Sequence, residues 1–116
     1  GYLAAAERAN GPVSAERRER WLAQDAEAVA ACWEALGAAP SLEADLSALT
    51  LPVLVYFGDQ DSGHAEAQRA TTLMPQATFL SLPGLDHGQA GDRIDLVIPH
   101  LQALHARVAA AAVSGF

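Results

Sequence analysis

The chain has 116 residues, 51% of them hydrophobic, which suffices for one domain with a core but not for two. Its net charge of −7, with only seven Lys and Arg residues, argues against nucleic acid or a membrane as a partner. The single cysteine, Cys32, excludes an internal disulfide and a Cys-x-x-Cys site. The sequence shows no secretory signal and no apolar stretch near the about 20 residues that span a bilayer, so we expect a soluble, cytoplasmic protein.

The first part of the chain has helical patterns. Residues 2–9 are rich in alanine, and Asn10-Gly11-Pro12 is typical of a helix stop. Ser14 is a candidate N-cap for a long amphipathic helix over residues 15–36, which Gly37 ends. The residues of its apolar face recur at helical spacing and are Trp21, Leu22, Val29, Cys32, Trp33 and Leu36. We expect this broad face to pack on something large.

The polar face of the same helix carries the basic residues Arg17, Arg18 and Arg20, which alternate with Glu16 and Glu19. Mixed charges of this kind line exposed helix faces. The cluster therefore indicates a solvated surface and not a site for an anionic partner.

Two short apolar runs, Val53–Phe57 and Thr78–Leu82, predict β-strands. The first run is apolar on both alternating faces, which is typical of a parallel strand covered on both sides. Residues 65–74 between the runs predict a helix, so strand, helix and strand form a βαβ unit. A last helix is expected over residues 92–112, and a helical turn over residues 43–49.

The predicted order of elements indicates an α/β fold with a parallel sheet. Two parallel strands are too few for a stable sheet, and a strand apolar on both faces is exposed to aggregation if it stands at an edge. We therefore expect the remaining strands to come from the amino-terminal part of a larger protein or from another chain.

Each predicted strand runs into a loop with a candidate for acid–base chemistry. Gly58-Asp59-Gln60-Asp61 follows the first strand, and Pro83-Gly84-Leu85-Asp86-His87 follows the second. The carboxyl ends of neighbouring parallel strands meet at one edge, where open α/β sheets bind ligands. An imidazole is a general base near neutral pH, and a carboxylate at its other nitrogen orients it, so His87 is the candidate base and Asp61 the candidate acid.

Three further observations limit this pair. Asp59 is the second candidate for the acid, and it ranks behind Asp61 because it sits one residue past Gly58, still close to the end of the strand. Asp86 is adjacent to His87 and is expected to form hydrogen bonds within its own loop. A Gly-x-Ser-x-Gly elbow, or its Cys or Asp equivalent, occurs nowhere in the 116 residues, so the pair has no nucleophile within the chain.

The two loop motifs resemble the carboxyl-terminal third of the α/β-hydrolase family, which typically reads Pro-Val-Leu-Val-x-x-Gly-x-x-Asp, a helix, a strand, then Pro-Gly-x-x-His and a final helix. Here Pro52-Val-Leu-Val-Tyr-Phe-Gly-Asp-Gln-Asp61 and Pro83-Gly-Leu-Asp-His87 match in register. The resemblance covers about residues 45–108. It implies a helical lid-like segment at residues 1–40 and the carboxyl-terminal βαβα part of the hydrolase core at residues 41–116.

The resemblance also implies a serine-type hydrolase that cleaves an ester, thioester or related acyl bond of a small molecule without a cofactor. Asp61 and His87 would be the acid and base, and the nucleophile and oxyanion hole would lie upstream of Gly1. One alternative is an aspartate nucleophile, as in dehalogenases and epoxide hydrolases of this fold. Another is a non-enzymatic module that binds a partner or dimerises through its open strand edge.

The remaining candidates are weighed against structural roles. Trp21 and Trp33 are packing residues or, if the lid resemblance holds, walls of an acyl or aromatic substrate pocket. His64 is a helix cap or a residue of the active-site rim. Cys32 lies on the apolar face and is expected to be a small buried residue. His100 and His105 are five residues apart on a helix and so lie on different faces, which argues against a metal site.

Overall fold

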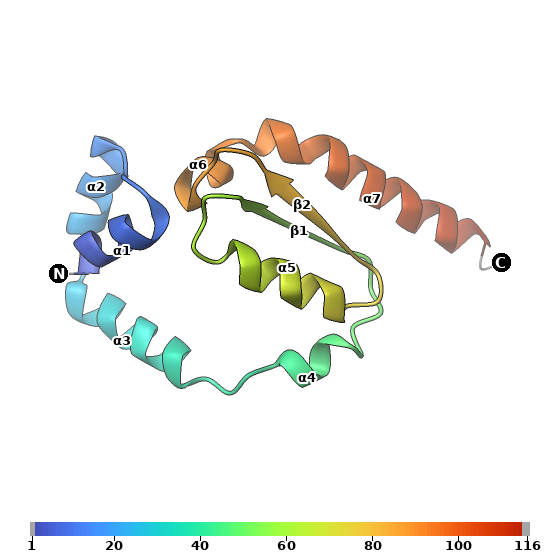
Figure 1. The fold of residues 1–116 in the computed structure, drawn as a ribbon, viewed down its shortest axis with the longest axis horizontal. Helices are drawn as coiled ribbons and strands as arrows, with labels where there is room; N and C mark the ends of the chain where they lie inside the picture. The colour runs from blue at the N-terminus through green and yellow to red at the C-terminus, as the bar shows by residue number, and fades with distance from the viewer. Residues whose placement is uncertain (1, 115–116) are drawn as a thin grey trace.

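The computed structural model describes residues 2–114. Along these residues, two strands alternate with helices, and a group of helices precedes them (Figure 1). The elements are α1 Tyr2–Asn10, α2 Ala15–Leu22, α3 Ala26–Ala38, α4 Glu43–Leu46, β1 Val53–Gly58, α5 His64–Leu73, β2 Ala77–Leu82, α6 His87–Asp92 and α7 Ile94–Ser114. The mixture of helices with a parallel strand pair is that of a partial α/β fold, as predicted.

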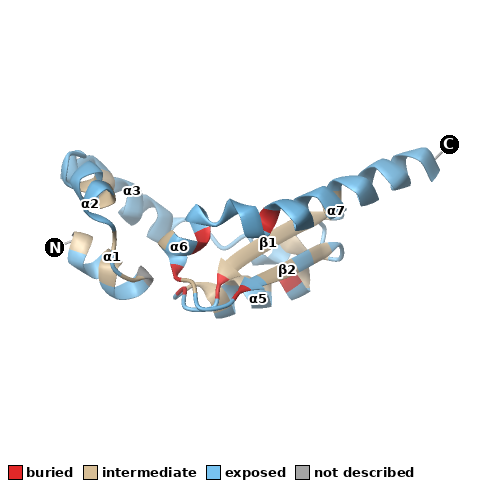
Figure 2. Cartoon of the chain, turned by 90° about the horizontal axis from the view of Figure 1, so that it is seen from above, coloured by how far each residue is buried: buried red, intermediate tan, exposed pale blue. Residues whose placement is uncertain are grey.

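The two strands form the parallel pair that the apolar runs predict. The register runs from Val53 opposite Ala77 to Gly58 opposite Leu82. The helix between them, α5, covers one face of the sheet, and α7 lies on the opposite face (Figure 2). The carboxyl ends of both strands therefore reach the same edge, where α6 begins.

The core lies between the sheet and the last two helices. Its buried apolar residues, among those described, are Leu82, Ala90 and Val97. They come from β2, α6 and α7, and half-buried side chains of both strands pack against them. Along β1 the apolar residues before Gly58 are only half-buried, so the cover expected on both faces of this strand is incomplete.

The long helix expected over residues 15–36 is wrong, because the chain forms α2 and α3 with a break between them. Asp25 caps α3, and its carboxylate accepts hydrogen bonds from the backbone N–H groups of Glu27 and Ala28 at 3.0 and 3.1 Å. Gly37 lies inside α3 and does not end it. The N-cap expected at Ser14 is confirmed, since its hydroxyl accepts the N–H of residue 17 at 3.2 Å.

The apolar face of these helices does not pack as expected. Leu22, Trp33 and Leu36 are 67%, 55% and 66% exposed. Cys32 is also exposed, which corrects the expectation of a buried residue. A helix with a broad apolar stripe buries it against another layer when one is present. Within the described residues, that layer is missing from α3.

The end of the chain differs from the sequence expectation in two ways. A separate short helix, α6, precedes α7 and carries His87 at its first position. Secondly, α7 is long and apolar enough to cross a membrane by length and composition, which corrects the expectation that no stretch is. This is weak evidence for a span, because core helices of soluble proteins also meet these criteria.

Candidate active site

The structure brings together the two residues that the loop motifs single out. His87 Nδ1 lies 2.7 Å from Asp61 Oδ2. The Asp61 side chain is only 5% exposed, whereas that of His87 is 63% exposed. The other oxygen of Asp61, Oδ1, accepts the backbone N–H of Gly63 at 2.8 Å. Both carboxylate oxygens thus have a hydrogen-bond partner, which fixes the orientation of the group.

This contact determines the tautomer of the ring. An ionised carboxylate only accepts hydrogen bonds, so the proton between His87 and Asp61 belongs to Nδ1. In the neutral ring, Nε2 then carries no proton and is an acceptor. Nε2 of His87 is therefore available as a base, while the buried carboxylate of Asp61 orients the ring through Nδ1.

The two strand-end loops hold each other in place. Gly58 allows their close approach, because a Cβ atom there would overlap the carbonyl group of Leu85. That carbonyl accepts the N–H of Gln60 at 3.0 Å. Asp59 accepts the N–H of Gly84 at 2.8 Å, where Gly84 has a φ of 73°. These contacts fix the loop of Asp61 relative to the loop of His87.

The same contacts remove the second candidate for the acid. Asp59 Oδ1 receives the side chain of Gln60 and the N–H of Gly84, so it links the loops and does not orient His87. The hydrogen bond from Gln60, then that from Gly84, holds the pKa of Asp59 below its usual range, and the nearby His64 adds to this effect.

Asp86 has the loop role expected for it, in a more specific form. It is the N-cap of α6, and its carboxylate accepts the N–H of Gln89 at 2.8 Å. The Gln89 side chain accepts the N–H of Asp86 in return at 3.0 Å, which completes a capping box. Asp86 is 8% exposed. This reciprocal cap fixes the first turn of α6 and with it the backbone of His87.

The turn between α1 and α2 and the first turn of α2 lie against α6. Arg17 forms an ion pair with Asp92 at 3.0 Å, and a Cβ atom on Gly88 would overlap the Arg17 guanidinium. Gly11, with a φ of 87°, approaches the Asp86 carboxylate as closely. The Arg17 side chain is 28% exposed, so it is not the solvated residue that the charge pattern predicts. It braces the helix that begins with His87.

The other two arginines of the basic cluster remain at the surface as expected. Arg18 pairs with Glu7 at 3.0 Å, and Arg20 pairs with Glu16 at 3.7 Å. Their side chains are 51% and 68% exposed. Exposed pairs of this kind contribute little to stability.

Among the described residues, His87 lines two of the hollows. The larger, about 280 Å³, is lined by Tyr56, Phe57, Asp61, His87, Ala90 and Gly91. The smaller, about 40 Å³, includes Arg17, Trp21 and Asp86 in its walls. Trp21 therefore lines the same hollow as His87.

Two other sequence candidates do not reach the pair. His64 is the first residue of α5, after the N-cap Gly63, and its Nε2 lies 2.8 Å from Ser81 Oγ. Its ring packs edge-to-face on Phe79 with centroids 5.2 Å apart, so it ties α5 to β2. Trp33, on α3, is among the walls of neither hollow.

No candidate metal site is found in the described part of the chain. Among residues 2–114, His, Cys, Asp and Glu residues form no group of three or more that could hold a metal ion.

The Asp-x-x-Gln spacing of Asp86 and Gln89 is a capping-box signal that could have located the start of α6. The Arg17–Asp92 pair joins residues 75 positions apart, so no local sequence pattern predicts it.

Comparison with known proteins assigns the chain to no family. The Asp61–His87 pair and the loops that hold it are the features from which a function can be inferred. No protein-family model, no curated protein and no solved structure matches the chain.

Proposed function

We propose that Asp61 and His87 are the acid and base of a serine-type hydrolase site of the α/β-hydrolase kind, which cleaves an ester, thioester or related acyl bond. The observation that supports this most is the 2.7 Å contact between an exposed imidazole and an almost fully buried carboxylate. The two residues follow adjacent parallel strands at the same edge of the sheet. This is the edge at which α/β sheets bind ligands.

In the proposed reaction, Nε2 of His87 takes the proton of a nucleophilic hydroxyl as that oxygen attacks the acyl carbon. The imidazolium then gives the proton to the leaving group as its bond to the acyl carbon breaks. In the second half-reaction Nε2 takes a proton from a water that attacks the acyl carbon, and returns it to the nucleophile's oxygen as that oxygen leaves. Asp61 keeps the ring in the required tautomer and stabilises the imidazolium. General base catalysis of this kind contributes about 10²–10⁴ in rate. The reaction requires no cofactor.

The nucleophile in this proposal comes from outside the chain, because the 116 residues contain no elbow motif. The hollow of about 280 Å³ beside the pair gives a nucleophile-bearing loop room to approach Nε2. Trp21, in the wall of the smaller hollow, supplies an apolar surface for the small-molecule acyl substrate. An aspartate nucleophile at the same place would change the reaction to that of a dehalogenase or an epoxide hydrolase.

A non-enzymatic binding module is the second candidate function. The half-buried, apolar strand β1 at an edge of the sheet favours it, since such an edge is a template for pairing with another chain. The buried, doubly bonded carboxylate of Asp61 favours the enzyme, because a module that binds only through its edge has no need to orient an imidazole.

The test is hydrolysis of a nitrophenyl ester by the protein isolated from its natural host and by variants made in that host. We expect His87→Ala to abolish turnover, and Asp61→Asn to lower it by about 10⁴ because the ring loses its tautomer control. His105→Ala, on the exposed side of α7, is the matched control and should retain activity. Retained turnover in His87→Ala would remove this ring from the mechanism.

A further inference from the structure

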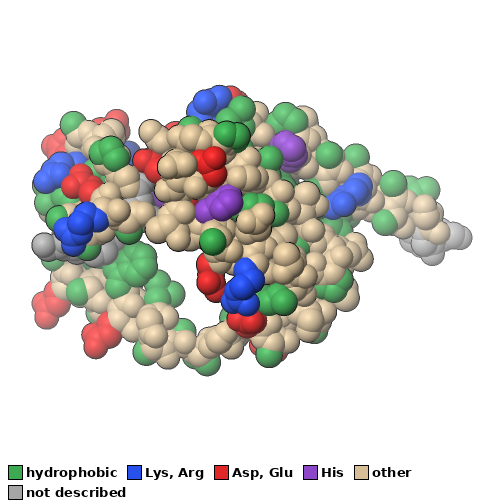
Figure 3. Space-filling view, in the orientation of Figure 1, with side chains coloured by type: hydrophobic (Ala, Val, Ile, Leu, Met, Phe, Trp, Pro, Cys, Tyr) green, Lys and Arg blue, Asp and Glu red, His purple; other side chains and the backbone are tan. Residues whose placement is uncertain are grey.

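A second contact of an imidazole, this time with a hydroxyl, lies on the α5 side of the sheet. Nε2 of His64, at the first position of α5, is 2.8 Å from Oγ of Ser81 in β2. Neither residue lines the two hollows beside His87. In Figure 3, which looks onto α5, histidine side chains (purple) reach the surface. The contact therefore joins a hydroxyl to a base outside the site described above.

The imidazole ring of His64 is held in its orientation by a second contact. It packs edge-to-face on the ring of Phe79, with the two planes at 72°. Phe79 and Ser81 are two positions apart in β2, so their side chains lie on the same face of the sheet. One strand thus supplies both the ring that supports His64 and the hydroxyl at its Nε2.

The surroundings of His64 favour the transfer of a proton to its ring. With the ring proton on Nδ1, Nε2 accepts the hydrogen bond of the Ser81 hydroxyl. Asp59 adds a negative charge nearby: after the hydrogen bonds from Gln60 and Gly84, the charge of His64 is among the causes that hold the pKa of Asp59 below its usual range. An anion near the ring stabilises the imidazolium that forms when Nε2 takes a proton.

The backbone of Ser81 supplies a donor for a developing oxyanion. The N–H of Asp59 donates to the carbonyl of Leu82 at 3.0 Å, so the backbone groups of Leu82 face β1. Those of Ser81, one position earlier, point away from β1 in a parallel ladder. Within residues 2–114, no strand pairs with that outer side of β2. The N–H of Ser81 can therefore donate to the oxygen of an acyl group that its own hydroxyl attacks.

Ser47 is an exposed serine whose hydroxyl contacts a backbone group instead. It donates to the carbonyl oxygen of Ala44, 3.4 Å away. A backbone carbonyl accepts a hydrogen bond but takes no proton at neutral pH, so it does not activate the hydroxyl. An imidazole takes the proton, and a hydroxyl beside such a base is an activated nucleophile. The two serines thus differ in the group that accepts from them.

Charge and shape limit the acyl donor that this second contact would use. The net charge of −7 and the carboxylate of Asp59 near His64 disfavour an anionic donor such as a phosphoanhydride. The two residues lie outside the hollows beside His87, so a large acyl chain gains no cover there. Uncharged esters and thioesters of small acyl groups are the class that fits.

We propose that Ser81 is a second acyl acceptor, with His64 as its base, for uncharged esters and thioesters of small acyl groups. Oγ of Ser81 forms a bond to the acyl carbon while Nε2 of His64 takes the hydroxyl proton. The bond from the acyl carbon to the leaving oxygen or sulfur then breaks. The leaving atom keeps the electron pair and receives the proton from the imidazolium. The products are O-acylated Ser81 and the free alcohol or thiol.

This step is independent of the proposed function, because it uses neither His87 nor a nucleophile from outside the chain. Acetylation by nitrophenyl acetate tests it on the protein isolated from its natural host. Trypsin releases residues 70–93 as one peptide, in which Ser81 is the only serine, and residues 21–69 as another, which contains Ser47. Mass spectrometry with fragmentation then gives the initial rate at each serine.

We expect Ser81 to gain the acetyl group at least about 100-fold faster than Ser47, which is the lower end of what a general base contributes. Denaturing urea should remove this difference, because it separates α5 from β2. Equal rates at the two serines in the folded protein would show that the hydroxyl is not activated. A ratio that persists in urea would show that the fold does not cause it. Either result would overturn the proposal.

His64→Gln, made in the natural host, tests the base itself, because an amide keeps a hydrogen bond to Oγ but takes no proton. We expect Ser81 to react in this variant at the rate of Ser47. His105→Gln, the same exchange on the exposed side of α7, is the matched control and should keep the parent rate. The melting temperature of each variant shows that it is folded. An unchanged rate in folded His64→Gln would mean that Nε2 only donates to Oγ, against the proposal.

His87→Ala separates this proposal from the proposed function. Loss of ester turnover with Ser81 still acetylated at the parent rate supports both. Turnover that persists in His87→Ala, with Ser81 acetylation that depends on His64, contradicts the hydrolase site and supports the second acceptor. Loss of Ser81 acetylation in His87→Ala would mean that the acyl group comes from the Asp61–His87 site, which would overturn the role of His64.

Discussion

The strand-end loops and the amino-terminal helices are built on different kinds of interaction. Asp61 and Asp86 are nearly buried, and their carboxylates accept hydrogen bonds from backbone N–H groups nearby. By contrast, α2 and α3 contain no buried residue, and the Trp33 side chain is 55% exposed. The loops satisfy their polar groups within the chain. The helices display apolar faces that need another layer.

Loops held by local hydrogen bonds keep their geometry where the core is incomplete, whereas apolar helix faces do not. Hydrogen bonds within a loop depend on residues a few positions apart or on the neighbouring strand, all of which this chain contains. An apolar helix face gains stability only from the area that it buries. The acid–base geometry is therefore formed here, while the helical segment is held at the site mainly by the turn that contacts α6.

The largest expected contrast comes from replacing one glycine in each region by alanine. Gly58→Ala should lower the free energy of unfolding by about 2–3 kcal/mol, because the new Cβ overlaps the Leu85 carbonyl and pushes the two loops apart. Gly37→Ala should raise it by about 0.5–1 kcal/mol, since the site is helical and, beyond the chain neighbours and the local helix backbone, no atom lies within 4 Å of the added Cβ. Urea denaturation of both variants measures the two values. Equal effects in the two regions would contradict the comparison.

A smaller contrast is expected from the two helix N-caps. Asp86→Ala removes the capping box of α6 and should cost about 1–2 kcal/mol. Ser14→Ala removes the exposed cap of α2 and should cost about 0.5–1 kcal/mol. Only the first variant should also change the NMR signal of the His87 Nδ1 proton, because only α6 carries that ring. A change of the signal in Ser14→Ala would show that the helical segment controls the site more strongly than the comparison states.

The sequence predicted the parts of the fold that local patterns encode. Both strands, their parallel pairing and the meeting of Asp61 with His87 followed from apolar runs and from loop motifs at the strand ends. The failures involve interactions that compete with a periodic pattern or that join distant residues. Asp25 interrupts a helical pattern as a cap, which the apolar spacing of its neighbours conceals.

Arg17 is a residue whose interactions join distant parts of the chain and were therefore not predicted. Its neighbours in the sequence indicate a solvated helix face, and two of the three arginines there are solvated. Arg17 instead pairs with Asp92, far along the chain, and its guanidinium occupies the space that a Cβ atom on Gly88 would take. Tertiary contacts of this kind depend on how two segments dock. The mixed charges of one helix carry no information about the docking partner.

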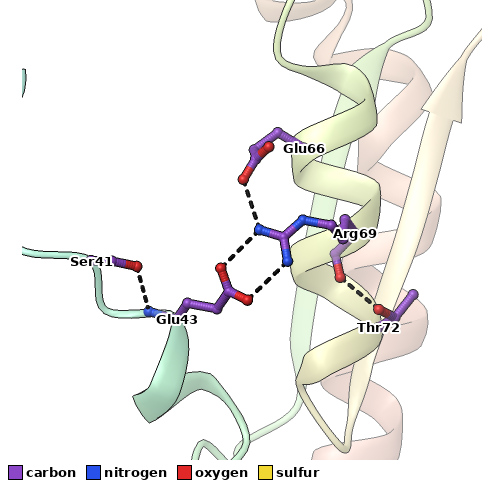
Figure 4. Close-up of polar contacts among 5 residues, drawn as sticks. All are labelled: Ser41, Glu43, Glu66, Arg69 and Thr72. Atoms are coloured by element: carbon purple, nitrogen blue, oxygen red, sulfur yellow. Dashed lines mark hydrogen bonds and ion pairs between the residues drawn. The ribbon is translucent and has the colours of Figure 1, made fainter.

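The connector between the two regions provides the smallest expected effect. Arg69 of α5 donates two hydrogen bonds to Glu43 of α4 at 2.9 Å each and a third to Glu66 at 2.9 Å (Figure 4). The hydrogen bonds from Arg69, and then its charge, hold the pKa of Glu43 below its usual range. The contribution of this pair to stability is therefore complete above the pKa of Glu43 in the unfolded chain. It is lost as the pH falls through the lower pKa of the folded chain.

Replacing Glu43 tests whether the connector belongs with the loops or with the helices. Glu43→Gln should lower the melting temperature slightly at neutral pH and leave it unchanged at low pH, so the acid side of the profile becomes flatter by the same small amount, because exposed ion pairs are weak. The double variant Glu43→Gln, Arg69→Gln should show the same flattening, and 1 M NaCl should remove the difference from the parent by screening the pair. An unchanged acid limb in Glu43→Gln would mean that α4 detaches from α5 in solution. The well-ordered region would then begin at β1, and the helical segment would be held only through Arg17 and the turn beside α6.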